Sequence, residues 1–274
     1  MLSGVILLWL ILTALSVAFV ATDIRSTPES AVLKWAFVLI TAYTGPFGAF
    51  LYVLGCREPL PGLHERYVSA RWRQVLGSTM HCVAGDGVGI LAGAVIGSAL
   101  GLSAPMHIAL EYVLGFGFGW TIFQALFMRD MAGGSFSRAV RLTFIPEFLS
   151  MNALMGGMIP VVTLTMVSIP GSDSPRGATF WFLMSMALLA GGIVAYPINW
   201  WLVARHLKHG MMTVRKVGAA EAAASETSRT MDHEKMAHAH GTNPSKGATA
   251  GMAVLSIAIF GLGIALSALL GGFH

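Results

Sequence analysis

Long apolar runs recur along the whole sequence, and each is about as long as a helix that crosses a bilayer. Such a helix needs roughly 20 apolar residues to cross about 30 Å of hydrocarbon. The chain is 55% hydrophobic and only 11% charged. We therefore predict an all-α fold, a polytopic transmembrane helical bundle of about seven spans. The expected spans are residues 2–22, 31–55, 75–101, 106–128, 143–169, 178–204 and 248–272.

Lysine and arginine fall mainly in alternate loops, and this asymmetry predicts an orientation. Short loops rich in these residues stay on the cytoplasmic side of a membrane. The loops after the second, fourth and sixth expected spans hold fourteen of them, against three on the other side. We therefore expect a cytoplasmic N-terminus and an external C-terminus. Contact with anionic lipid accounts for the net charge of +4, and no pattern typical of nucleic-acid binding is visible.

The loop lengths divide the chain into three parts. Short loops join the first six spans, so residues 1–204 are expected to form one six-helix bundle. Residues 205–247 are a cytoplasmic linker, whose basic first part, from His206 to Lys216, is predicted to continue the sixth span as a helix near the lipid surface. The rest of the linker has too few aliphatic residues for a core and is expected to be flexible. Residues 248–274 form the seventh transmembrane helix.

The linker also holds a short run of imidazole and thioether side chains. This mixture suits copper or another soft to borderline metal, because Met favours Cu(I) and His binds several transition metals. The alternative is a solvated polar linker without a metal. The candidate ligands are Met231, His233, Met236, His238 and His240.

The third expected span carries His81, Cys82 and Asp86. Ionisable groups inside a bilayer are costly, so such a cluster indicates a function. Cys82 and Asp86 are four residues apart and share one face of a helix, whereas His81 lies on the adjacent face. The other cysteine is Cys56 at the end of the second span, and we expect both thiols to be free.

Glycines recur every four residues along the same span and form a slowly drifting stripe on one face. Small residues let neighbouring helices approach closely, so this stripe is predicted to pack against another helix, a partner protein or a second copy of the chain. Its members are Gly85, Gly89, Gly93, Gly97 and Gly101.

The fifth expected span carries a stripe of one carboxylate and three thioethers at helical spacing. If the third and fifth spans touch, this stripe would face Cys82 and Asp86 at about the same depth in the membrane. Sulfur donors select soft ions, although methionines are also good packing residues. The stripe consists of Glu147, Met151, Met155 and Met158.

Four stretches of the sequence together resemble a bacterial integral-membrane family known as domain of unknown function 4396, over most of residues 31–212. The resemblance implies a multi-pass protein of the bacterial inner membrane, and it brings no established activity. Members often occur beside copper-handling proteins, and some have a second cysteine where this chain has Asp86. The stretches are His81-Cys-Val-Ala-Gly-Asp86, Phe127-Met-Arg-Asp-Met-Ala-Gly-Gly-Ser135, Pro146-Glu-Phe-Leu-Ser-Met-Asn152 and Tyr196-Pro-Ile-Asn-Trp-Trp-Leu202.

These patterns favour a protein that binds or transports a soft transition metal, with copper as the first choice. Cys82, Asp86, Met151 and Met155 would be inner ligands and Glu147 a cytoplasmic gate. The alternative is a non-enzymatic membrane scaffold, assembly factor or accessory subunit of a larger complex. No sequence motif of a hydrolase, nucleotide-binding protein, zinc protease or dinucleotide enzyme is present, so we do not expect an enzyme.

Overall fold

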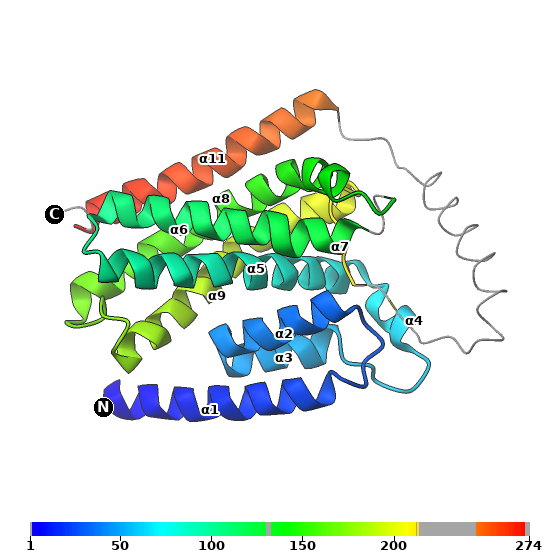
Figure 1. Ribbon diagram of the computed structural model, residues 1–274, viewed down its shortest axis with the longest axis horizontal. Coiled ribbons are helices and arrows are strands. Elements are labelled where there is room, and N and C mark those ends of the chain that lie inside the picture. The colour runs from blue at the N-terminus through cyan, green and yellow to red at the C-terminus, as the bar shows by residue number, and fades with distance from the viewer. Residues whose placement is uncertain (1, 130–132, 212, 214–244, 272–274) are drawn as a thin grey trace.

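The computed structural model describes residues 2–129, 133–211, 213 and 245–271, and these residues form helices and no strands (Figure 1). Six helices in the described part are long and apolar enough to cross a membrane. They confirm the all-α bundle that the sequence predicts. They are α1 (Leu2–Asp23), α5 (Arg71–Ala99), the continuous unit of α6 (Ala104–Phe118), η1 (Gly119–Gln124) and α7 (Ala125–Arg129), α8 (Phe136–Ser168), α9 (Ala178–Ala204) and α11 (Lys246–Leu269).

The second expected span is a helical hairpin instead of a single crossing, and this corrects the prediction of seven spans. Helix α2 (Ala31–Thr44) ends at Gly45, whose φ of 59° is in the left-handed region, and α3 (Pro46–Gly55) begins at the next residue. Pro46 occupies the first position of α3, where its missing N–H is not needed. The chain reverses there, so α2 and α3 lie side by side and are shorter than their neighbours (Figure 1).

Contacts between the two arms establish the hairpin. The rings of Phe37 and Tyr52 are 5.7 Å apart, whereas a continuous helix would separate these residues by roughly 22 Å. A Cβ atom on Gly48 would lie 2.6 Å from the Cα of Thr41, so the arms pack backbone against backbone. The Tyr52 hydroxyl donates to Asp23 at the end of α1 over 2.7 Å, which ties the hairpin to the first helix.

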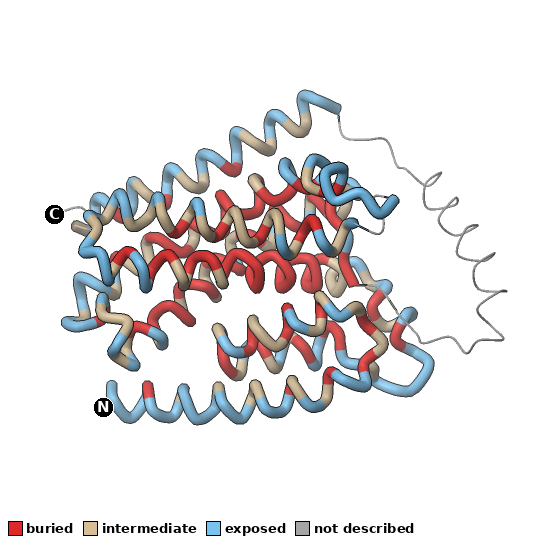
Figure 2. The backbone as a smooth tube through the Cα atoms, viewed as in Figure 1, coloured by how far each residue is buried: buried red, intermediate tan, exposed pale blue. Residues whose placement is uncertain are grey.

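Helices α5 and α8 form the centre of the bundle, because buried residues concentrate on them (Figure 2). The glycine stripe of α5 lies against α6 and η1. A Cβ on Gly89 would collide with the backbone of Leu114, and a Cβ on Gly93 would lie 2.8 Å from the Cα of Glu111. Gly85 faces Phe123 and Gly97 faces His107 in the same way.

Gly101 departs from the stripe. It follows α5 with a φ of 61°, and a Cβ there would meet no atom within 4 Å. Its role is to end the helix, since glycine adopts this left-handed conformation without steric cost.

Helix α11 packs along α8 through small residues and hydroxyl groups. A Cβ on Gly156 would lie 2.8 Å from the side chain of Ile259. Asn152 donates to the Ser256 hydroxyl over 3.2 Å, and Thr163 and Ser267 share a hydrogen bond near the other end. The seventh expected span therefore lies against the six-helix part of the bundle.

Helices α1 and α11 run in opposite directions along the bundle, so the start of α1 and the end of α11 lie at the same end (Figure 1). A cytoplasmic N-terminus and an external C-terminus do not both fit this arrangement. Among the described residues, every lysine and arginine except Arg176 lies in or next to helix ends at the other end of the bundle. By the positive-inside rule we predict that this end faces the cytoplasm and that the start of α1 and the end of α11 face the outside.

A topology assay tests this assignment. We expect a reporter that is active only outside the cytoplasm to be active when fused before Met1 or after His274, and inactive when inserted at Gly62, in the loop after α3. The physical reason is that the hairpin returns the chain to the side that it left. Opposite activities for the two terminal fusions would mean that residues 31–55 cross the membrane.

The close contact between α5 and α6 gives a second prediction. We expect Gly89→Leu to lower the stability of the purified protein by about 3 kcal/mol, on the order of 10 °C in melting temperature, because its side chain would meet immobile backbone. Gly117→Leu is the matched control, since a Cβ there meets nothing within 4 Å. Equal melting temperatures for the two variants would show that the glycine stripe does not set this contact.

Candidate functional site

Three side chains from α5 and α8 meet at the centre of the bundle. The Cys82 Sγ lies 3.3 Å from the Oδ2 of Asp86, and it lies 3.5 and 3.4 Å from the two carboxylate oxygens of Glu147. One atom from each of the three residues lies within 4.8 Å of the other two. All three side chains are buried. Sequence spacing on α5 and contact between α5 and α8 thus bring a thiol and two carboxyl groups together; we refer to Cys82, Asp86 and Glu147 as the central cluster.

Polar side chains around the central cluster hold its members in place. The Ser150 hydroxyl lies 3.1 Å from the Cys82 sulfur and accepts a hydrogen bond of 2.9 Å from Asn199 on α9. Asn199 also donates to the Ala195 carbonyl one turn earlier, which fixes its amide. Three helices therefore contribute polar groups to one buried network, so its geometry depends on how they pack.

Lys208 is part of this network, although the sequence predicts it at the lipid surface. Helix α9 ends at Ala204, and His206 adopts a φ of 57°, so the chain turns back into the bundle. The Lys208 ammonium lies 3.2 Å from Glu147 and donates to the side-chain Oδ1 of Asn199 over 3.1 Å. The expected surface helix from His206 is thus wrong over its described part, because Lys208 and Met211 are buried.

The formal charges of the central cluster and of Lys208 do not cancel when both carboxyl groups are ionised. Burial disfavours the charged form of Lys208, but the neighbouring Cys82, Glu147 and Asp86 outweigh this effect and raise the pKa of its ammonium above the ordinary value. One ammonium therefore faces two carboxyl groups and a thiol. If both carboxyl groups are ionised, one formal negative charge remains, and a proton or a further cation must balance it in this dry interior.

Gly119 lets the backbone approach the two carboxyl groups closely. It begins η1, a π-helical turn between α6 and α7, and such turns are frequent at functional sites. A Cβ on Gly119 would collide with the Oδ1 of Asp86 and approach the Oε1 of Glu147. That Asp86 oxygen has no hydrogen-bond partner among the described residues. The unpaired acceptor of the central cluster therefore lies against a backbone position that has no room for a side chain.

The predicted methionines continue from the central cluster along α8. Met151, Met155 and Met158 are all buried. The Met151 methyl group would lie 2.7 Å from a Cβ on Gly115, which packs against the backbone of Asp86. Met155 and Met158 line a small cavity of about 30 Å³ together with Glu111 of α6. A line of thioethers thus leads from the central cluster towards the end of the bundle at which α6 begins.

Glu111 extends this line towards His107. One carboxylate oxygen of Glu111 lies 3.7 Å from the Nε2 of His107, one helical turn earlier on α6. The same nitrogen lies 3.0 Å from the Ala94 carbonyl oxygen of α5. An acid and an imidazole therefore lie at the end of the line farther from Lys208.

The structure separates His81 from the other predicted ligands. Its ring lies between Phe123 and Phe127, with centroid distances of 5.6 and 4.9 Å. Neither ring nitrogen has a hydrogen-bond partner in the part of the chain that the structure describes. It lies on the face of α5 next to that of Cys82, as the helical spacing predicts. The linker candidates Met231, His233, Met236, His238 and His240 lie outside the described residues.

Sequence reasoning did not identify three residues of the site. Ser150 lies beside the predicted Glu147 and Met151 stripe, and its one-turn offset from Glu147 is a signal that was available. The sequence gives no such signal for Gly119 or Lys208. A π-helical turn positions Gly119, and a reversal of the chain after α9 positions Lys208.

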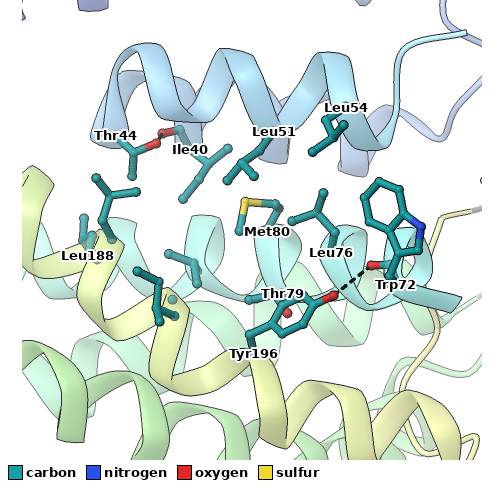
Figure 3. A pocket seen from close by; sticks show the side chains of 14 residues that line it. Ile40, Thr44, Leu51, Leu54, Trp72, Leu76, Thr79, Met80, Leu188 and Tyr196 are labelled. Carbon is teal, nitrogen blue, oxygen red and sulfur yellow. Dashed lines mark hydrogen bonds between the residues drawn. The ribbon is translucent and has the colours of Figure 1, made fainter. Parts of the chain in front are cut away.

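A pocket elsewhere in the bundle differs from the central cluster, because its lining is mainly apolar (Figure 3). A pocket of about 380 Å³ lies between the α2–α3 hairpin, α5 and α9. Its two threonines, Thr44 and Thr79, donate to carbonyl groups of their own helices. The Tyr196 hydroxyl donates to the Trp72 carbonyl over 3.2 Å. The lining therefore suits a hydrocarbon group and offers nothing to an ion.

Comparison with known proteins identifies one family. A family model described as a domain of unknown function, DUF4396, matches residues 71–208, half of the chain. The matched segment begins at the first residue of α5 and ends at Lys208, so it contains every residue of the central cluster and its ammonium partner. No curated protein and no solved structure matches the chain significantly.

A double-mutant cycle measures the ion pair. We expect Lys208→Met and Glu147→Gln each to cost about 3–5 kcal/mol, because each leaves a buried charged group without its partner. The double variant should cost less than the sum by about 0.5–3 kcal/mol, since neither charge then remains. Thermal unfolding in detergent checks this result.

The control is a pair at the surface. Arg57 bonds Asp23 over 2.9 Å, but its side chain is 48% exposed, so Arg57→Met should cost only about 0–1 kcal/mol. Additive effects of Lys208→Met and Glu147→Gln would contradict a coupled pair.

Proposed function

Since the chain belongs to the DUF4396 family, whose description assigns no activity, we propose from the geometry of its own residues that it binds a soft transition metal, copper first, inside the membrane and transports it. The observation that carries the proposal is the central cluster, in which the donor atoms of Cys82, Asp86 and Glu147 lie within 4.8 Å of one another. A thiol is a ligand for soft metals, and carboxylates neutralise their charge.

The surroundings of Asp86 support a cation at this place. Its Oδ1 is unpaired among the described residues, and it lies against Gly119, where a Cβ atom would collide with it. An unsatisfied carboxyl oxygen in a membrane-length bundle is costly, so it calls for a ligand. When both carboxyl groups are ionised, the remaining negative charge favours a positively charged ligand.

The methionines favour copper over a harder metal. Thioethers are ligands for Cu(I), and they have little affinity for Mg²⁺, Ca²⁺ or Mn²⁺. Met151, Met155 and Met158 follow the central cluster along α8 and end beside Glu111. This series supplies a route of sulfur atoms between the centre of the bundle and the end that we assign to the outside.

Lys208 lies at the opposite end of this route and closes it. Its ammonium is bonded to Glu147, on the side that we assign to the cytoplasm. A metal ion that reaches Glu147 competes with this ammonium for the same carboxylate. Lys208 thus acts as the counter-ion of the metal-free state and as a barrier to the entry of cations from that side.

A non-transporting scaffold or accessory subunit is the second candidate. The contact of 3.2 Å between Lys208 and Glu147 favours it, because a buried carboxylate that already has a partner needs no metal. The two candidates differ in whether the central cluster takes up metal.

Metal content of the purified protein tests the proposal. All proteins should lack residues 231–240, so that histidines and methionines of the linker add no copper. We expect one Cu(I) per chain when this shortened protein is prepared with copper and reductant. Cys82→Ser combined with Asp86→Asn should lose this ion, because it removes the thiol and one charge.

Gly119→Ala tests the geometry without removing a ligand. We expect at least a tenfold loss of Cu(I) affinity, because the added methyl group would collide with the Asp86 carboxyl group and displace it. Gly117→Ala, two residues away and open, should bind like the parent protein. Equal Cu(I) content in the parent and in Cys82→Ser/Asp86→Asn would rule out the central cluster as a metal site and leave the scaffold.

A further inference from the structure

A second group of metal-ligand side chains lies at the end of the bundle at which the hairpin begins and ends. Glu29 precedes α2, Cys56 follows α3, and His64 is the first residue of α4 (His64–Val68). A carboxylate oxygen, the sulfur and a ring nitrogen of these residues lie within 4.8 Å of one another. The hairpin creates this group, because it returns Cys56 to the end from which α2 started.

All three side chains are removed from water. Glu29 is 4% exposed, and Cys56 and His64 are fully buried. Both acid and imidazole have partners in this structure, and Glu29 accepts a hydrogen bond of 2.8 Å from the Ser30 N–H. The adjoining loop of residues 57–63 is largely exposed.

Hydrogen bonds orient the imidazole within the group. The Nε2 of His64 lies 3.0 Å from the Cys56 carbonyl oxygen, and its Nδ1 lies 2.9 Å from the Thr213 hydroxyl. A metal at one nitrogen would replace one of these bonds and leave the other. Metal-bound histidines usually keep such a bond from the second nitrogen to a carbonyl, carboxylate or water, and it fixes the ring.

We propose that Glu29, Cys56 and His64 bind a second metal ion, a borderline divalent cation such as zinc(II). Thiolate, imidazole and carboxylate together are the ligand types that zinc prefers. Three protein ligands leave a fourth position of a tetrahedral ion for water. On binding, the thiol loses its proton to solvent, so the affinity rises with pH. This site stands on its own residues and does not depend on the proposed function of the central cluster.

The two sites share one segment of the chain. Residues 205–211 and 213 follow α9, with Lys208 bonded to Glu147 and Thr213 bonded to His64. Between them, the methyl group of Met211 would lie 3.9 Å from a Cβ on Gly55, next to Cys56. Metal at His64 therefore acts on the same segment that carries the ammonium of the central cluster.

Cobalt(II) is the probe, because thiolate ligation gives it an intense charge-transfer absorption in the near ultraviolet. The sequence has two cysteines, so the full-length Cys82→Ser protein retains only Cys56. We expect this protein to show the absorption with one equivalent of cobalt, and excess zinc to abolish it. His64→Gln and Glu29→Gln in the same background should each weaken cobalt binding at least tenfold.

Controls separate ligation from general effects on the fold. Glu65→Gln removes an exposed acid next to His64, and His206→Gln removes an exposed imidazole, so both should bind cobalt unchanged. Zinc should raise the melting temperature of Cys82→Ser and leave that of Cys82→Ser/Cys56→Ser unchanged. This stability measurement detects binding even where a variant folds poorly in the absence of metal.

The result that overturns the inference is a folded Cys82→Ser protein without a thiolate absorption and without stabilisation by zinc. The proposed function of the central cluster is tested independently in Cys56→Ser, which keeps Cys82. Binding in only one of the two single-cysteine proteins therefore supports one site and rejects the other.

Discussion

The ion pair between Lys208 and Glu147 is the interaction on which the centre of this bundle depends. Removing a carboxylate and an ammonium from water costs several kcal/mol each, and only close pairing and further hydrogen bonds offset this. Here the ammonium also reaches Asn199, whose amide holds Ser150 against Cys82. Loss of Lys208 would therefore remove both the countercharge of Glu147 and the anchor of the network. A bundle that needed only hydrophobic packing would have no reason to keep these groups.

The backbone makes this pair possible in two places. Gly119 lies in a π-helical turn, so α6 and η1 pass close to the carboxyl groups without adding atoms between them. His206 reverses the chain after α9, so Lys208 enters the bundle from its end instead of continuing into solvent. Both features are local departures from a straight helix. They position the polar side chains of the site between regular helices. Small changes of backbone geometry there have large effects on the distances between these side chains.

The helical parts of this arrangement can be predicted from the sequence, and most of the departures from them cannot. A four-residue spacing puts Cys82 and Asp86 on one face, and hydropathy identifies α1, α5, α6, α8, α9 and α11. Hydropathy does not distinguish one span of 25 residues from a hairpin, because both bury apolar side chains in lipid. Gly45 followed by Pro46 is the signal of the reversal, since glycine adopts positive φ and proline begins a helix readily. For Lys208 no local pattern exists, because its partner comes from α8.

The hairpin also decides how the parts of the chain relate to the membrane. Because residues 31–55 return to their starting end, Glu29, Cys56, His64 and Lys208 all lie at that end, which the positive-inside rule assigns to the cytoplasm. Metal bound near His64 and metal bound at the central cluster would then act on the two ends of one short segment. The first replaces a bond of His64, and the second competes with Lys208 for Glu147. If the metal at His64 replaces the bond to Thr213, each ion would weaken a contact that holds this segment in the bundle, and linkage would then make binding at either site favour binding at the other.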